Sequence, residues 1–94
     1  MQFILECQDK DGGLDLRLST RPEHLAYMQG KVDHIVIAGP ILDEATGNPV
    51  GSLIVLDYPD RVGAEDFAAN DPYAKAGLFK SVSIRPFRKV LPSA

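Results

Sequence analysis

The chain has 94 residues, of which 45% are hydrophobic and 24% charged, and its formal net charge is −3. This length and composition predict a single globular domain over residues 1–94 and exclude a disordered or fibrous chain. The ten lysines and arginines form no basic and aromatic stripe for nucleic acid, and no apolar run reaches the roughly 20 residues that span a bilayer. A lone Cys7 and an N-terminus without a signal-peptide pattern favour a cytoplasmic protein.

The first predicted element is a strand over residues 2–8. Its apolar side chains Phe3, Leu5 and Cys7 alternate with a mixed set at the even positions. Either set could face the helices of the fold, and the sequence leaves that choice open. A polar loop with two glycines, residues 9–13, is expected to end the strand.

Two helices are predicted next. Residues 14–19 carry leucines that fit both a strand and a helical stripe, and we favour a short helix. A second helix is expected to begin at Thr20, because a threonine N-cap, Pro22 in the first turn and Glu23 at the third position together form a helix-start signal. This helix should end near Gly30.

A hairpin is predicted after these helices. Residues 34–42 are rich in β-branched and apolar side chains and form its first strand. Pro40 restricts that strand to a sheet edge or a bulge, because proline cannot donate a hydrogen bond to a neighbouring strand. Turn formers gather in residues 43–49, and the second strand covers residues 50–58.

The last third of the chain predicts a helix and a strand. Asp60 is expected to cap the helix, which should end at Asp71 because Pro72 disfavours the helical conformation for the residue before it. Residues 79–90 then alternate as a strand. One of its faces carries Val82 and Ile84, and the other carries Phe79, Ser81, Ser83, Arg85 and Phe87.

These elements give the order β-α-β-β-α-β. Right-handed crossovers fold this order into a four-stranded antiparallel sheet with both helices on one face, which is the α+β ferredoxin-like architecture. The opposite face stays uncovered, and we expect it to carry Phe79 and Phe87. Because a monomer of this size buries only roughly 60–65% of its unfolded surface, we expect a second copy to cover that face in a homodimer.

The candidate site is a histidine with a carboxylate. Histidine exchanges protons near neutral pH, and a carboxylate beside it can fix its tautomer. The predicted fold brings the helix that carries His24 close to the bend at Asp71, so we predict that the two side chains form a proton-transfer pair facing one pocket. Substrate-binding neighbours are expected to be Arg21 for an anionic group, Tyr73 for a planar one, and Met28 and Phe79.

Other chemical groups are interpreted as structural. Cys7 has no cationic neighbour in the sequence and is expected to be a small buried hydrophobe. His34 follows Asp33 at a strand start and is expected at the rim of the sheet. The histidines and the cysteine lack metal-ligand spacing, and the two glycines of the first loop lack the Lys-Ser/Thr pattern of a phosphate loop. We therefore expect neither a metal nor a cofactor.

Four segments resemble the YciI-like (YCII-related) family, namely RPEHL at 21–25, AGP at 38–40, DPYAKAGL at 71–78 and VSIRPF at 82–87. The resemblance covers nearly the whole chain in order. It implies a ferredoxin-like dimer of the dimeric α/β barrel type, with a His–Asp pair in a cleft that carries over onto His24 and Asp71. One branch of the family resembles dehydrochlorinases that act on chlorinated hydroxyquinols, while most members have no established activity.

Two main functions stay open on these grounds. The first is a small cofactor-independent enzyme, a lyase or a hydrolase-like protein, that uses His24 and Asp71 for proton transfer on an unknown small molecule, with elimination as the reaction that the resemblance implies. The second is a non-catalytic or stress-associated dimeric module that binds a small molecule without turning it over. A purely structural dimerisation domain would leave both residues freely replaceable.

Overall fold

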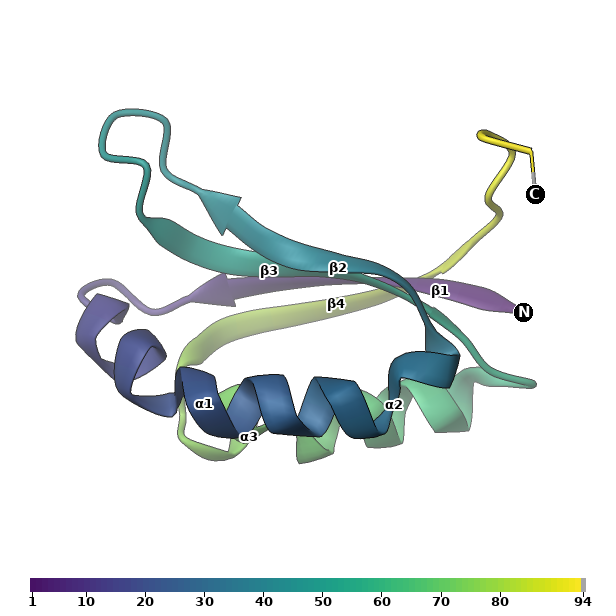
Figure 1. Ribbon diagram of the computed structural model, residues 1–94, viewed down its shortest axis with the longest axis horizontal. Helices are drawn as coiled ribbons and strands as arrows, with labels where there is room; N and C mark the ends of the chain where they lie inside the picture. The colour runs from purple at the N-terminus through teal and green to yellow at the C-terminus, as the bar shows by residue number, and fades with distance from the viewer. Residues whose placement is uncertain (94) are drawn as a thin grey trace.

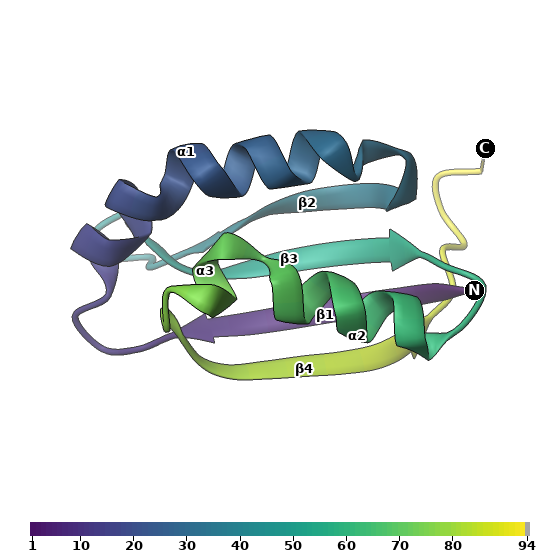
Figure 2. The same ribbon diagram turned by 90° about the horizontal axis from the view of Figure 1, so that it is seen from below.

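The computed structural model describes residues 1–93 as an antiparallel sheet in the order β2-β3-β1-β4, with helices on one face (Figure 1, Figure 2). The strands are β1 (Gln2–Asp9), β2 (Ile35–Leu42), β3 (Pro49–Asp57) and β4 (Phe79–Phe87). The helices are α1 (Leu14–Gly30), α2 (Arg61–Asn70) and α3 (Pro72–Lys75), and the 3₁₀ helix η1 (Val32–His34) joins α1 to β2. Within residues 1–93, no helix combines the length and the apolar character that a membrane crossing requires. The architecture confirms the predicted ferredoxin-like fold.

The hydrophobic core lies between the sheet and the helices. From β1 it takes Phe3, Leu5 and Cys7, each at most 3% exposed. Their neighbours on β3 include Ile54 opposite Leu5 and Leu56 opposite Phe3, and both are equally buried. Full burial of one such aliphatic or aromatic side chain contributes about 1.5–3 kcal/mol. The apolar set of β1 therefore faces the helices, which answers the question that the sequence left open.

Helix α1 is continuous, so the prediction of two helices with a cap at Thr20 is wrong. Thr20 lies inside the helix and is 7% exposed, and Pro22 is an interior residue. Pro22 has no N–H for the carbonyl of Leu18, but Leu18 is 52% exposed, so this part of the helix is open to solvent. Figure 1 shows the first turns of α1 at an angle to the rest, as a proline kink predicts.

Strand β2 is an edge strand, as Pro40 predicts. It pairs with β3 alone, and Pro40 stands opposite Ser52 in that ladder. The hairpin that follows is also confirmed, because the Asp43 side chain accepts hydrogen bonds from the backbone N–H and the hydroxyl of Thr46. The hairpin leads into β3, the strand that carries Ser52 and Ile54 beneath α1.

Strand β4 corrects the predicted position of Phe79. Ser81 pairs with Gln8, but Phe79 pairs with Asp9, so one extra residue of β4 breaks the alternation. Phe79 consequently turns to the helix side of the sheet, where it packs against the core with Ile84. The expectation that Phe79 lies on the uncovered face is therefore wrong, and the strand ends at Phe87 rather than at residue 90.

The face of the sheet opposite the helices is not covered by any helix within residues 1–93 (Figure 1), and exposed apolar side chains lie on it. Ile37 is 61% exposed, Ile41 39% and Phe87 41%. Between them an ion pair joins Arg85 of β4 to Glu6 of β1, its direct neighbour strand. Aliphatic, aromatic and paired charged groups together make up this open face of the sheet.

Candidate active site

Asp71 lies at the corner between α2 and α3. Its backbone has φ −59° and ψ 127°, outside the helical region, as expected for a residue before proline. The carboxylate caps the short α3, because Oδ1 accepts the N–H of Tyr73 at 3.0 Å. The side chain is 2% exposed. A buried anion is thus held in place by the backbone of the segment that follows it.

His24 and Asp71 are in direct contact across the fold. Nδ1 of His24 lies 2.9 Å from Oδ1 of Asp71. A carboxylate accepts hydrogen bonds only, so Nδ1 carries the proton and donates it. In a neutral ring this leaves Nε2 without a proton and able to accept one. His24 and Asp71 therefore lie at the direct hydrogen-bond distance that the sequence predicts, and Nε2 is the ring nitrogen that Asp71 does not bind.

Tyr73 forms one wall beside the histidine. Its ring stacks on that of His24, with centroids 4.0 Å apart and planes inclined by 18°. The centroid of the Tyr73 ring also lies 4.5 Å from Cζ of Arg17, which makes a cation–π contact. Burial raises the pKa of Tyr73 above its usual range, although Arg17 opposes this shift. Tyr73 is therefore a neutral phenol near neutral pH and can donate a hydrogen bond.

Arg17 is a site residue that the sequence reasoning missed. Its Nε and Nη2 donate to the two carboxylate oxygens of Asp9 at 2.7 and 2.9 Å, and Nη2 also donates to the hydroxyl of Ser52 at 2.9 Å. Both charged side chains are 5% exposed. Burial disfavours the cation, yet the hydrogen bonds and charge of Asp9 together raise the pKa of Arg17. Arg17 is therefore a cation near neutral pH.

A signal for Arg17 was present in the pattern of α1. Residues 17, 21, 24 and 28 recur at helical spacing and share one face of the helix. The inner face of α1 buries Arg17, Thr20 and His24, while Leu18 and Leu25 are about half exposed. A helix that buries polar side chains and exposes leucines points to a polar site beneath it.

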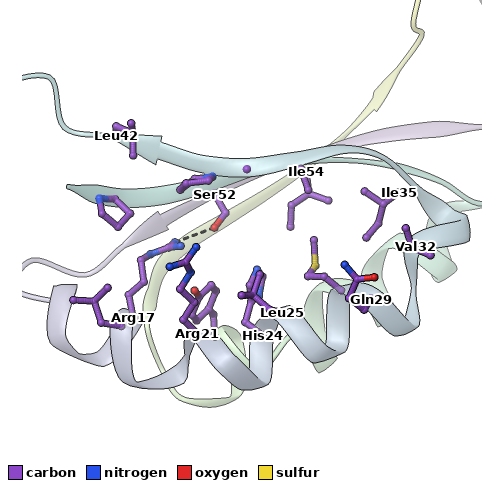
Figure 3. Close-up of a pocket in the computed structure, with 17 residues that line it drawn as sticks. Arg17, Arg21, His24, Leu25, Gln29, Val32, Ile35, Leu42, Ser52 and Ile54 are labelled. Carbon is purple, nitrogen blue, oxygen red and sulfur yellow. Dashed lines mark hydrogen bonds between the residues drawn. The ribbon is translucent and has the colours of Figure 1, made fainter. Parts of the chain in front are cut away.

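These side chains line a cavity of about 530 Å³ between α1 and the strands β2 and β3 (Figure 3). Of the residues predicted for the site, His24, Arg21, Tyr73 and Met28 are on its wall. Figure 3 shows Arg17, Arg21 and His24 extending from α1 toward the sheet. The remaining lining residues are mostly apolar, namely Leu18, Leu25, Val32, Ile35, Ala38, Pro40, Leu42, Pro49 and Ile54, with Gln29, Gly39 and Ser52.

Two predicted site residues do not line this cavity. Asp71 is sealed behind His24, so a ligand in the cavity would touch the imidazole and not the carboxylate. Phe79 lies behind Tyr73, with an edge-on ring contact at 6.0 Å between centroids. Of these three residues, His24 alone lines the cavity, while Asp71 and Phe79 contact residues of its wall.

The residues interpreted as structural have the expected surroundings. Cys7 is a buried free thiol, and burial, followed by the negative charge of Asp71, raises its pKa to about 12. His34 stacks on Tyr58 with centroids 4.2 Å apart, and its Nδ1 lies 3.0 Å from the carbonyl oxygen of Asp57. Neither residue lines the cavity beside His24. His34 is therefore a matched control for experiments on His24.

The raised pKa of Cys7 predicts a loss of stability in alkali. Between the ordinary thiol pKa of 9.0 and the folded value of about 12, the unfolded chain releases a proton that the folded chain keeps. The free energy of unfolding should therefore fall as pH rises above 9, by up to about 1.4 kcal/mol per pH unit from this one group. Chemical denaturation from pH 8 to pH 10.5 measures the slope. The tyrosines add to it, so Cys7→Ala should give a shallower slope than the native chain, and equal slopes would contradict the assignment.

The sequence and the fold can be compared with those of known proteins. A model of the YCII-related domain matches residues 1–88. Protein YciI of Escherichia coli is 35% identical, with 96% of this chain and 99% of that protein aligned. An uncharacterized protein of Haemophilus influenzae is 32% identical over the same shares of the two chains.

Two solved structures extend the comparison. The 5-chloro-2-hydroxyhydroquinone dehydrochlorinase of Burkholderia phenoliruptrix, in complex with 2,5-dihydroxybenzoquinone, has a TM-score of 0.89 and 29% identity over 94% of each chain. SnoaB, a cofactor-independent oxygenase of Streptomyces nogalater, has a TM-score of 0.56 and 15% identity over 98% of this chain and 96% of its own, a likeness of fold alone. The family match over residues 1–88 and the relatives that align along almost the whole chain lead to one conclusion: this chain belongs to the YCII-related domain family.

Proposed function

We propose that this protein is a small enzyme in which His24 exchanges a proton with a small molecule bound in the cavity. The observation that carries the proposal is the 2.9 Å hydrogen bond from Nδ1 of His24 to Asp71, on a ring that lines the cavity. This bond fixes the tautomer that leaves Nε2 free, and the carboxylate stabilises the imidazolium that forms when Nε2 takes a proton. Asp71 is the positioning residue, and Arg21, Tyr73 and Met28 are proposed substrate contacts.

Elimination is the reaction class that we propose. The dehydrochlorinase structure that is 29% identical supports this choice, because its fold covers 94% of this chain. In such a step on a chlorinated hydroquinone, the ring first takes its keto form, in which the proton of one hydroxyl has moved to the carbon that bears chlorine. Nε2 of His24 then takes the proton of the hydroxyl para to the new carbonyl. The electron pair of that O–H bond forms a second C=O bond, the ring double bond shifts, and the C–Cl bond breaks as chloride departs. The products together with the proton on His24 balance the substrate, and no oxidant or reductant is consumed.

A direct assay tests the proposal. The native protein is incubated with 5-chloro-2-hydroxyhydroquinone without oxygen, and chloride release is followed against a protein-free control. We expect one chloride for each substrate molecule consumed, at a rate proportional to protein concentration. If no chloride is released while 2,5-dihydroxybenzoquinone still binds in a calorimetric titration, the protein is a binding module for such molecules, and the proposed enzymatic function is wrong.

We also propose that the protein works as a homodimer in the cytoplasm, with the open face of the sheet as the interface. Ile37, Ile41 and Phe87 expose apolar area there, and a small chain gains most by covering such a face with its own copy. Sedimentation at micromolar concentration should give twice the chain mass of 10.2 kDa.

A charged substitution locates the interface. Ile37→Asp should shift the protein to a monomer, because it would place a carboxylate in an apolar contact. Val62→Asp is the matched control, since Val62 is 60% exposed and lies on α2, on the other side of the sheet. A monomeric native protein, or equal behaviour of the two variants, would contradict this interface.

A further inference from the structure

The charged groups on the cavity wall have one sign. The 17 lining residues include Arg17, Arg21 and His24 and no aspartate or glutamate. Asp9 and Asp71 bind Arg17 and His24, but neither carboxylate is on the wall. Within residues 1–93, Arg21 forms no ion pair. A ligand in the cavity therefore meets the guanidinium of Arg17, the additional free cation of Arg21 and, on a neutral His24 ring, the unprotonated Nε2.

Arg17 and Arg21 are spaced to share an anion. They are one helical turn apart on α1, a spacing at which like charges repel each other. In Arg17, Nε and Nη2 make the three hydrogen bonds to Asp9 and Ser52, and Nη1 takes part in none of them. Figure 3 shows both side chains extending from α1 toward the strands. Two guanidinium groups in this arrangement match the oxygens of a carboxylate or a phenolate.

The other end of the cavity is apolar. Met28, Val32 and Ile35 follow His24 along the chain and meet Ile54 of β3 at the wall. Arg17 and Met28 are 11 residues apart on one helix, which is about 16 Å at 1.5 Å per residue. The cavity volume of about 530 Å³ exceeds the roughly 150 Å³ that holds a benzene molecule in a protein core. A ring with substituents therefore fits between the two ends.

We infer that the cavity selects a small organic anion with an apolar, ring-sized body. Its charged oxygens bind at Arg17 and Arg21, and its body lies against Met28 and Ile54. His24 lies between the two ends on α1, so Nε2 faces the part of the molecule next to the anionic group. Arg17 is then a specificity-determining residue that Asp9 and Ser52 hold in position. The inference rests on the proposed function only in taking this cavity as the substrate site.

Benzoate and benzamide test the charge preference, because they have nearly the same shape and differ in charge. Each is titrated into the ¹⁵N-labelled protein, and the affinity is obtained from amide shifts around the cavity. We expect the native protein to bind benzoate at least tenfold more tightly than benzamide. Arg21→Met should reduce that ratio at least fivefold, and it should fold normally because Arg21 is exposed. Arg88→Met, an exposed arginine outside the cavity, is the matched control and should keep the ratio.

A double variant tests Arg17 itself. Arg17→Met alone would leave the carboxylate of Asp9 buried without a partner, so Asp9→Asn is introduced with it. This pair of changes should also reduce the ratio at least fivefold, with folding verified by the amide spectrum. Equal affinity of the native protein for the two probes, no binding of benzoate, or a ratio that both variants leave unchanged would overturn the inference.

The test is independent of turnover, since benzoate has no leaving group. If chloride release fails and the benzoate preference holds, the proposed elimination is wrong and the anion site stands. If turnover is observed and the preference is absent, the anion site is wrong and the proton-transfer proposal stands.

Discussion

Replacing His24 with glutamine is expected to lower kcat for chloride release from 5-chloro-2-hydroxyhydroquinone by about 10²–10⁴-fold, the usual contribution of a positioned general base or acid. Glutamine can donate a hydrogen bond to Asp71 and fill part of the space of the imidazole, but it cannot take up a proton. The loss therefore reports proton transfer rather than a collapsed site. Steady-state kinetics measures it, and thermal unfolding verifies that the variant is folded.

His34→Gln is the control for this experiment. His34 also stacks on a tyrosine and places Nδ1 near an oxygen acceptor, but it lies outside the cavity lined by His24. Its kcat should stay within twofold of the native value. A similar loss in both variants would mean that the effect comes from stability, and an active His24→Gln enzyme would remove His24 from the reaction.

Asp71→Asn is expected to lower kcat by about 10- to 100-fold while KM changes little. Asparagine keeps an oxygen for the N–H of Tyr73, so the α3 cap survives, but the negative charge opposite Nδ1 is lost. A hydrogen bond to a charged group contributes about 1.5–3 kcal/mol, and each 1.36 kcal/mol changes a rate tenfold. KM is expected to stay nearly unchanged because the Asp71 side chain does not line the cavity. This separation of kcat from KM is the signature of a positioning residue.

The matched control for Asp71 is Asp66→Asn, which removes the same charge from an exposed position on α2. It should leave both kinetic constants unchanged. If Asp71→Asn instead raises KM in proportion to its loss of kcat/KM, the carboxylate contributes to ligand binding. The positioning role would then be wrong.

Local rules predicted the parts of this fold that depend on neighbouring residues. Pro72 restricted Asp71 to a corner, and Pro40 restricted its own strand to the edge of the sheet. Both effects follow from the ring of proline, which restricts the preceding residue and removes a backbone N–H. Asp60 capped α2 as expected, with its side chain accepting the N–H of Val62. The contact of His24 with Asp71 could also be predicted from the sequence, because the order of elements can bring the helix that carries His24 close to the bend at Asp71.

Tertiary contacts decided what the sequence could not. Arg17 is held by Asp9, eight residues away, and by Ser52, 35 residues away. These partners draw the first turns of α1 onto the sheet, and the helix runs on through Pro22. Phe79 lies on the helix side of the sheet and not on the open face, because the pairing of β4 with β1 shifts by one residue. An alternating sequence pattern does not predict such a shift. The buried arginine was missed because only its spacing along α1, and no motif, indicated it.

The state of the His24 ring tests the central claim most directly. Two-dimensional ¹H–¹⁵N correlation of the histidine side chains, recorded at a pH where the rings are neutral, identifies which nitrogen carries the proton. The hydrogen bond to Asp71 predicts a protonated Nδ1 and a free Nε2 in His24. Addition of 2,5-dihydroxybenzoquinone should then move the Nε2 resonance of His24 and leave that of His34 in place. A proton on Nε2, or an Nε2 resonance that the quinone does not move, would contradict the account.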